Sequence, residues 1–171
     1  MRISISALVG AAAVAFLVSA AQASDSRASM AGLGAIRIGM GIPALERALG
    51  TRLPETQDAE DDACRQVEAG PSWPGTSVML LKGRVARIDV NERGTLTLSG
   101  AAVGDTQASV IKRYGRRLSS SAHAYGVDDS KYLTMFSSDH RYGIRFETDG
   151  ERITSYYVGT AEAVQFIEGC V

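Results

Sequence analysis

Hydrophobic positions recur with the period of a helix in a short segment near the start of the patterned part of the chain. Ile42, Leu45 and Leu49 share one face of a predicted helix. Pro43 suits its first turn, and Gly50 suits the position just after its end. We therefore expect a short amphipathic helix here.

A second helix is predicted further along the chain. Asp105 or Thr106 can cap its N-terminus, Val110 and Tyr114 share one face, and Gly115 stops it. Each helix has about three turns or fewer, which is too short to be stable alone in water. Both helices must therefore pack against the rest of the protein.

Apolar and alternating runs after each helix predict strands. The expected strands are 63–68, Thr76–Leu81, Arg84–Val90 and a short one at 95–98, followed by 118–125, Lys131–Phe136, 142–147 and 152–158. Lys82-Gly83 and Asp149-Gly150 are predicted hairpin turns. The pattern indicates an α+β fold in which the helices pack on one face of an antiparallel sheet.

The two predicted helices open in the same way. Gly39 and Gly104 are 65 residues apart, and Gly50 and Gly115 have the same separation. We expect two diverged repeats, 35–100 and 101–171, that form one compact unit, each with a short helix followed by three or four antiparallel strands. Residues 24–34 carry no periodic pattern and are predicted to be a flexible leader.

The segments that open the predicted repeats, Ile36-Arg37-Ile38-Gly39-Met40 and Val103-Gly104-Asp105-Thr106, resemble the opening of small exported bacterial domains. One such family is the small lipoprotein of the outer-membrane assembly machinery, and the other has the β-lactamase-inhibitor-protein fold. The resemblance implies tandem copies of helices followed by an antiparallel sheet, and a non-enzymatic role in binding another protein. The chain departs from the lipoprotein pattern because no Cys lies directly after its apolar N-terminal run, where the lipid would be attached.

The N-terminus has the layout of a secretory signal peptide. Arg2 precedes an apolar stretch at 3–18, and Ala21-Gln22-Ala23 is a small-residue cleavage site. The stretch is too short for a good membrane span. We expect residues 1–23 to be removed by cleavage near Ala23 and the protein to be periplasmic or secreted.

The chain contains two cysteines, Cys64 and Cys170. An even count in an exported protein favours a disulfide, with two free thiols as the alternative. Neither C-x-x-C nor H-x-x-x-H spacing occurs, so we expect no metal site, and the sequence shows no cofactor motif.

Charge narrows the class of partner. The 171 residues carry 18 basic and 19 acidic side chains, for a net charge of −1. Nucleic-acid binders usually carry a basic surplus, so we expect no nucleic-acid partner. No segment after the signal peptide is apolar enough to span a membrane, and the oligomeric state is open.

Residues with catalytic potential are present, but their spacing is not that of a catalytic site. Ser119, Ser120 and Ser121 lie near His123, although neighbouring residues on a strand point to opposite faces. Glu147, Asp149 and Glu151 lie at a predicted turn, where solvated carboxylates are usual. A small secreted hydrolase using a serine, His123 and an acidic residue stays as an alternative.

Aromatic residues concentrate in the second predicted repeat, where all six Tyr fall between Tyr114 and Tyr157. Tyr and Arg are enriched in protein interfaces. We predict a partner-binding surface on the outer face of the second repeat's sheet and the nearby Pro/Gly-rich loop, composed of Trp73, Tyr132, Arg145, Arg152, Tyr156 and Tyr157. The alternative is that most of these rings belong to the core. The acidic loop at 58–62 is the next candidate surface.

The function predicted from the sequence is that of a non-enzymatic exported protein that binds another envelope or secreted protein, as an inhibitor, an immunity protein or an envelope-assembly accessory. The alternatives are the hydrolase and a ligand-binding module for a small envelope molecule. An exposed Tyr/Arg sheet face would favour the first, and a His, acid and Ser cluster in a cleft would favour the second. A closed apolar pocket would favour the third.

Overall fold

The computed structural model describes residues 26–55, 63–127 and 129–170. The predicted signal peptide at 1–23 and the acidic loop at 58–62 lie outside these residues. The elements in chain order are β1 (Ala28–Ser29), β2 (Gly32–Leu33), β3 (Ile36–Arg37), α1 (Ile42–Leu49), β4 (Cys64–Glu68), β5 (Thr76–Leu81), β6 (Arg84–Val90), α3 (Gln107–Tyr114), η1 (Gly115–Arg117), β7 (Ser119–Ala122), β8 (Lys131–Phe136), β9 (Tyr142–Thr148), β10 (Ile153–Thr160) and η2 (Ala163–Gln165). The predicted α+β class is confirmed.

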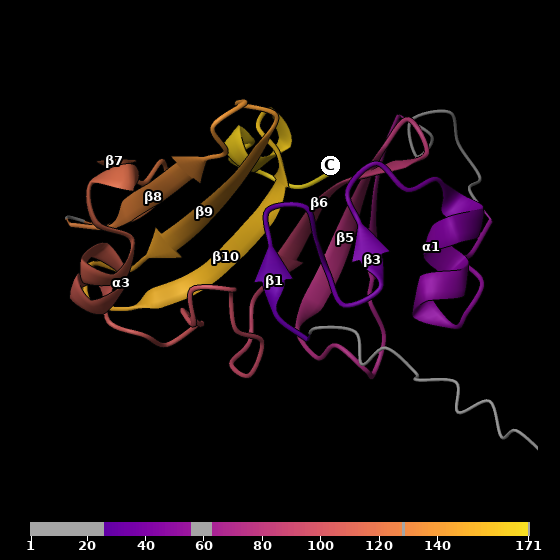
Figure 1. Ribbon diagram of the computed structural model, residues 1–171, viewed down its shortest axis with the longest axis horizontal. Coiled ribbons are helices and arrows are strands. Elements are labelled where there is room, and N and C mark those ends of the chain that lie inside the picture. The colour runs from indigo at the N-terminus through magenta and orange to yellow at the C-terminus, as the bar shows by residue number, and fades with distance from the viewer. Residues whose placement is uncertain (1–25, 56–62, 128, 171) are drawn as a thin grey trace, which may run out of the picture.

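A seven-stranded antiparallel sheet organises the molecule, in the order β4-β5-β6-β10-β9-β8-β7 (Figure 1). Lys82 and Gly83, both with left-handed φ of 50° and 70°, make the predicted tight turn between β5 and β6. Asp149-Gly150 makes the corresponding turn between β9 and β10. At the centre, β6 and β10 pair antiparallel, with Asp89 opposite Tyr157.

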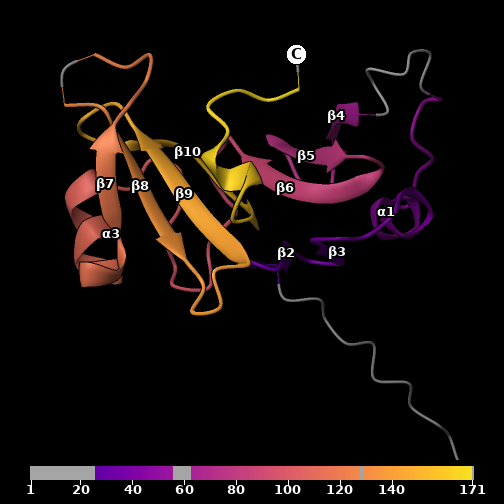
Figure 2. The ribbon, with the colours of Figure 1, turned by 90° about the horizontal axis from the view of Figure 1, so that it is seen from above.

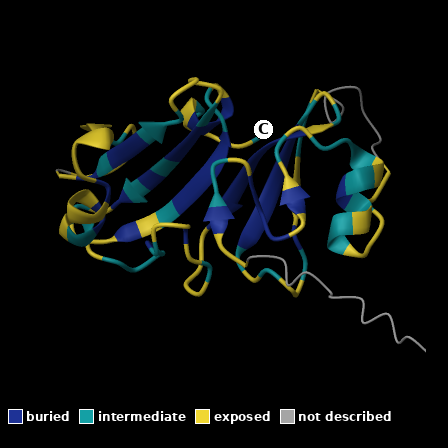
Figure 3. Ribbon diagram, in the orientation of Figure 1, coloured by how far each residue is buried: buried dark blue, intermediate teal, exposed yellow. Residues whose placement is uncertain are grey.

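Helices α1 and α3 pack on the same face of this sheet. Leu45 of α1 and Val110 and Tyr114 of α3 are buried in one continuous core with inward residues of the sheet such as Ile88 and Phe146. Figure 3 shows buried strands along the middle of the molecule and exposed outer faces on the helices. The helical pattern in the sequence therefore identified the buried faces correctly.

The prediction of a flexible leader at 24–34 is wrong for its described part. Strands β1 and β2 fall within it and pair with β3 in a three-stranded sheet, and Ala28 and Leu33 are almost fully buried. The Ala28 backbone also bonds to the segment predicted as strand 95–98, which forms an isolated bridge at Thr97 instead. Strands of two residues are too short to show a periodicity, so only their packing reveals them.

The middle of the opposite face of the large sheet, over β6, β9 and β10, is covered by the C-terminal segment of the described chain. We call residues 161–170, which include η2, the C-terminal strap. The strap follows β10 and lies on the side of the sheet away from α1 and the small sheet (Figure 2). We call the sheet face beneath the strap the outer face.

Candidate binding site

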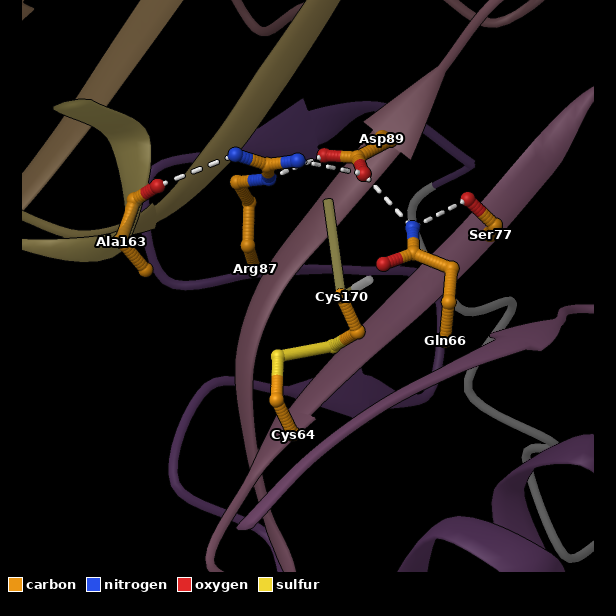
Figure 4. The surroundings of a disulfide bond; sticks show 7 residues. All are labelled: Cys64, Gln66, Ser77, Arg87, Asp89, Ala163 and Cys170. Atoms are coloured by element: carbon orange, nitrogen blue, oxygen red, sulfur yellow. Dashed lines mark hydrogen bonds and ion pairs between the residues drawn. A yellow bond between two sulfur atoms is a disulfide. The ribbon is translucent and has the colours of Figure 1, made fainter. Parts of the chain in front are cut away.

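The C-terminal strap is fastened to the sheet by the predicted disulfide. Cys64, the first residue of β4, is bonded to Cys170, with 5.3 Å between their Cα atoms (Figure 4). Met79 and Ala86 of the outer face form a small buried cluster with Ala163 of the strap. The bond joins an edge strand to a segment 106 residues later.

A buried ion pair lies on the outer face beside the disulfide (Figure 4). Arg87 Nε is 2.6 Å from Asp89 Oδ1, and the two side chains are only 6% and 9% exposed. Arg87 also donates to two carbonyl oxygens of the strap, and Gln66 donates to the second oxygen of Asp89 at 2.7 Å. Each charge is thus paired and hydrogen-bonded, which a buried charge requires. This cluster anchors the strap.

The predicted binding surface is not exposed at its tyrosines. Tyr156 lies on the core face with no exposure, and its hydroxyl donates to the Thr95 carbonyl at 3.0 Å. Tyr157 and Tyr132 are on the outer face, but each is only 4% exposed. The alternative that these rings are buried is therefore correct for all three, because the strap and neighbouring side chains cover the outer face.

Tyrosine and arginine side chains do lie side by side on the outer face, as predicted, but they stack on one another. The Arg87 guanidinium lies 4.5 Å from the Tyr157 ring centre, and that of Arg145 lies 4.9 Å from the centre of Tyr132. Arg145 also donates to a carbonyl of the strap at 3.2 Å. Burial raises the pKa of Tyr157, and the neighbouring Glu147 carboxylate raises it further. These residues hold the sheet and strap together.

The remaining predicted surface residues lie elsewhere. Arg152 is exposed and donates to the Gly104 carbonyl at 2.9 Å. The Trp73 ring packs against Gly34 and the main core, so close that a side chain at Gly34 would collide with it. Trp73 is therefore on the core side of the sheet, and it cannot share one surface with Tyr132 and Tyr157.

The geometry around His123 does not resemble a hydrolase triad. Its Nε2 is 3.4 Å from a Glu147 oxygen, and its Nδ1 accepts the Tyr125 backbone N–H at 3.2 Å. Both ring nitrogens are therefore occupied, and no serine is among these partners. Glu147 also accepts the Tyr157 hydroxyl at 3.1 Å. The His123 and Glu147 pair is a structural contact at the edge of the outer face.

The hairpin carboxylates have no environment that would suit acid catalysis. Asp149 accepts the backbone N–H groups of Arg152 and Glu151 at 2.7 and 2.9 Å, and these bonds lower its pKa. A general acid at neutral pH needs a raised pKa instead. Across the described ranges, no three His, Cys, Asp or Glu side chains gather in a way that could hold a metal ion.

An apolar pocket of about 350 Å³ lies on the core side of the sheet. It is open to solvent between β1, the loop that follows Thr97, α3 and strands β8 and β9. Its lining residues are Ala28, Ser29, Met30, Ala31, Thr97, Leu98, Ser99, Tyr114, Met135 and Ile144. None of them is charged, and the volume falls within the range of small-molecule sites.

The pocket wall is rigid on one side and adaptable on the other. The Tyr114 hydroxyl donates to Thr97 Oγ1 at 2.9 Å, which also accepts the Ala101 N–H at 2.9 Å, so the buried polar atoms here are satisfied. Met30 and Met135 are flexible, polarisable side chains that can fit apolar groups of different shape. Leu98, which is 55% exposed, stands at the rim.

Reasoning from the sequence missed this pocket. Ala28 to Ala31 fell in the predicted leader, and Thr97 and Leu98 fell in the short strand predicted at 95–98. The lining residues are of types that do not indicate a binding site in a sequence. The pocket depends on packing between segments that are far apart in the chain.

The described part of the chain contains no helix long and apolar enough to cross a membrane. The chain matches no protein-family model, no curated protein and no solved structure.

Proposed function

We propose that this protein is an exported, non-enzymatic binding protein whose binding site is the apolar pocket. The observation that carries the proposal is a solvent-open cavity of about 350 Å³ without a charged residue in its lining. Such a lining can bind an apolar group but offers no acid, base or nucleophile arrangement for catalysis.

Of the partners considered, a small envelope molecule with an apolar part fits the pocket best. A protein partner that inserts an apolar side chain beside Leu98 is the second candidate, favoured by the exposure of that leucine. An inhibitor, immunity or assembly role would belong to this second candidate, since the predicted Tyr/Arg face that first suggested it is covered.

A bulky residue at the pocket mouth tests the proposal. Ala31 is exposed and lines the pocket, so Ala31→Trp should fill its entrance without disturbing the core. Ala35 is also exposed but lies outside the lining, and Ala35→Trp is the matched control. We expect native mass spectrometry of protein isolated from the envelope to show a bound small molecule in the wild type and in Ala35→Trp only. Equal retention in Ala31→Trp would contradict the proposal.

We also propose that the chain is made of two diverged copies, as the 65-residue spacing suggested. Two equivalent sets of hydrogen bonds support this. Gly39 N–H donates to the Val85 carbonyl at 2.7 Å, and Val85 N–H donates back to Met40 at 2.8 Å. Gly104 and Ile153 are joined in the same way, at 2.8 Å, with a return bond to Asp105 at 2.9 Å.

Arginine contacts and the strand order also support two diverged copies. Arg84 donates to the Gly39 carbonyl at 3.1 Å, and Arg152 donates to the Gly104 carbonyl at 2.9 Å. In the sheet, β4-β5-β6 and β8-β9-β10 would be related by a two-fold axis between β6 and β10, with β7 as an addition. Tandem copies are also what the resemblance to the β-lactamase-inhibitor-protein fold implies.

Export to the periplasm or the medium is part of the same proposal. The disulfide supports it, because such bonds persist in oxidising compartments. Mass spectrometry of the native protein should find Ser24 or a close neighbour at the N-terminus, and an intact Met1 in protein recovered from the envelope would refute the prediction.

A further inference from the structure

Positive charges cluster at the end of the helix that contributes Tyr114 to the pocket wall. The last turn of α3 and the following η1 carry four cations in six residues, Lys112, Arg113, Arg116 and Arg117, and all four are exposed. No Asp or Glu occurs between Thr106 and Tyr125. Tyr114, in the middle of this run, is buried and forms part of the pocket wall. The C-terminal end of α3 therefore carries both a residue of the pocket wall and a run of exposed cations.

Two of these arginines are held directly at the pocket wall. Arg113 Nη1 donates to the carbonyl of Ser99, a lining residue, at 3.1 Å. Arg117 Nε donates to the carbonyl of Tyr114 at 3.4 Å. The carboxylate of Asp105 is 4.0 Å from Arg113 Nη2, which is a weak contact at an exposed site. The Arg113 guanidinium keeps further donors for an anion at the rim.

The size of the cavity indicates the length of the apolar part. In another protein, an engineered apolar cavity of about 150 Å³ binds a benzene molecule. A cavity of about 350 Å³ is roughly twice as large. It would therefore hold a hydrocarbon of about ten carbons. The methionines in the wall would adjust to a flexible chain better than to a rigid ring system.

We propose that the ligand is a single-chain anionic amphiphile, with its hydrocarbon chain in the pocket and its head group against Arg113. This inference rests on the proposed function, and it specifies the chemical class of the ligand. A carboxylate or phosphate at the rim would form charge-assisted hydrogen bonds with the guanidinium while its chain displaces water from the pocket. The occupant is a dispersed amphiphile and not a membrane surface.

The test measures binding of decanoate, decanol and decyltrimethylammonium to the mature protein by titration calorimetry, below their aggregation concentrations. We expect decanoate to bind with one site per chain and the other two to bind more weakly. Arg113→Gln should weaken decanoate binding about tenfold, the factor that corresponds to losing one charge-assisted hydrogen bond, and should weaken decanol binding much less. Arg113→Lys should restore part of the affinity.

The variants Ala31→Trp and Ala35→Trp, together with phospholipid vesicles, distinguish binding in the pocket from binding to a membrane surface. Decanoate binding that is lost in Ala31→Trp and kept in Ala35→Trp supports the inference. Equal binding of decanoate and decanol, with both lost in Ala31→Trp, overturns the head-group assignment and leaves the proposed function intact. Failure of all three probes to bind counts against the proposed function itself. Equal capture of wild type and Ala31→Trp by anionic phospholipid vesicles would show a membrane-binding surface and overturn the inference.

Discussion

Arg87 and Asp89 are two residues apart on the same strand, and their charges meet beneath the C-terminal strap. Strand alternation places both side chains on the outer face, where solvation by water is nearly absent. Each charge therefore depends on the other and on the groups that hydrogen-bond to the pair. Such a pair is costly to break and contributes mainly to holding the strap in one position.

Removing one member of this pair should be strongly destabilising. We expect Arg87→Met to lower the free energy of unfolding by about 3–5 kcal/mol, because the Asp89 carboxylate is left buried without its partner. Urea denaturation followed by circular dichroism measures the change. The double variant Arg87→Met/Asp89→Leu should recover most of the loss.

Arg141 provides the control, since its pair with Asp139 is exposed, at 70% and 52% for the two side chains. Arg141→Gln should leave the denaturation midpoint nearly unchanged. A similar small effect of Arg87→Met would show that water reaches the cluster.

Tyr156 and Tyr157 should make the protein unstable in alkali. Burial raises the pKa of both hydroxyls above the ordinary value near 10. Their contribution to stability is fully present below about pH 10, and it is lost as the pH rises above that value, because only the unfolded chain releases the proton easily. Each such group adds a slope of about 1.4 kcal/mol per pH unit.

The measurement is urea denaturation at several values between pH 9 and 12. Tyr157→Phe removes one ionisable group and keeps the ring, so the fall in stability above pH 10 should be shallower than in the wild type. An identical slope in the variant would mean that Tyr157 ionises in the folded protein.

At the scale of elements, each α-helix is joined to the sheet through the residues just before it. Gly39 and Gly104 have φ of 90° and 88°, and each donates its N–H to a strand carbonyl. A left-handed backbone at these points turns the chain from the sheet edge into the helix. A residue with a side chain adopts this conformation only with strain.

The two glycines should respond alike to substitution if the copies are equivalent. Gly39→Ala and Gly104→Ala should each cost about 1–3 kcal/mol from backbone strain. In Gly104→Ala the new Cβ also meets the flexible Arg93 side chain, so its cost should be equal or greater.

Gly41, with φ of −79° and an open surrounding, is the control for these two variants. Gly41→Ser should leave stability unchanged or raise it by a few tenths of a kcal/mol, because serine can cap α1. A cost at only one of the two glycines would argue against equivalent copies. Thermal denaturation of the three glycine variants and the wild type measures these differences in stability.

At the scale of the whole molecule, the sheet is held together by contacts between segments that are far apart in the chain. The disulfide joins β4 to the last described residue, and the strap crosses the strands between them. Strand β1 meanwhile pairs with the segment around Thr97, and the two together form part of the pocket wall. Segments that are not part of the large sheet therefore pack on both of its faces.

Loss of the disulfide should destabilise the protein through its unfolded state. Closing a loop of 106 residues is worth up to about 4–5 kcal/mol in the chain-entropy model, and the usual range is about 2–4 kcal/mol. Cys64→Ser/Cys170→Ser should unfold at lower urea concentration by a corresponding amount. The wild type is measured again with added reductant, and its urea denaturation midpoint should then approach that of the variant. An unchanged midpoint in both would show that the strap is held by its other contacts alone.

The sequence by itself determined both α-helices, three strands to the residue, the tight turns and the cysteine pairing. These features depend on interactions among near neighbours, such as helical periodicity at Leu45, alternation in β6 and the turn at Lys82-Gly83, or on a simple count. Local patterns specify them regardless of what lies opposite. The spacing of Gly39 and Gly104 also drew attention to the matching helix openings.

Only the tertiary structure decided which aromatic rings are exposed and where a ligand can bind. Tyr156 and Tyr157 look equivalent in the sequence, yet Tyr156 lies in the core and Tyr157 lies under the C-terminal strap. No periodic pattern in the sequence predicts the strap. The pocket brings together Ala28, Leu98 and Ile144, which are far apart in the chain. Burial and concavity are properties of packing between distant segments, and the residue types involved are the same as those of an ordinary core.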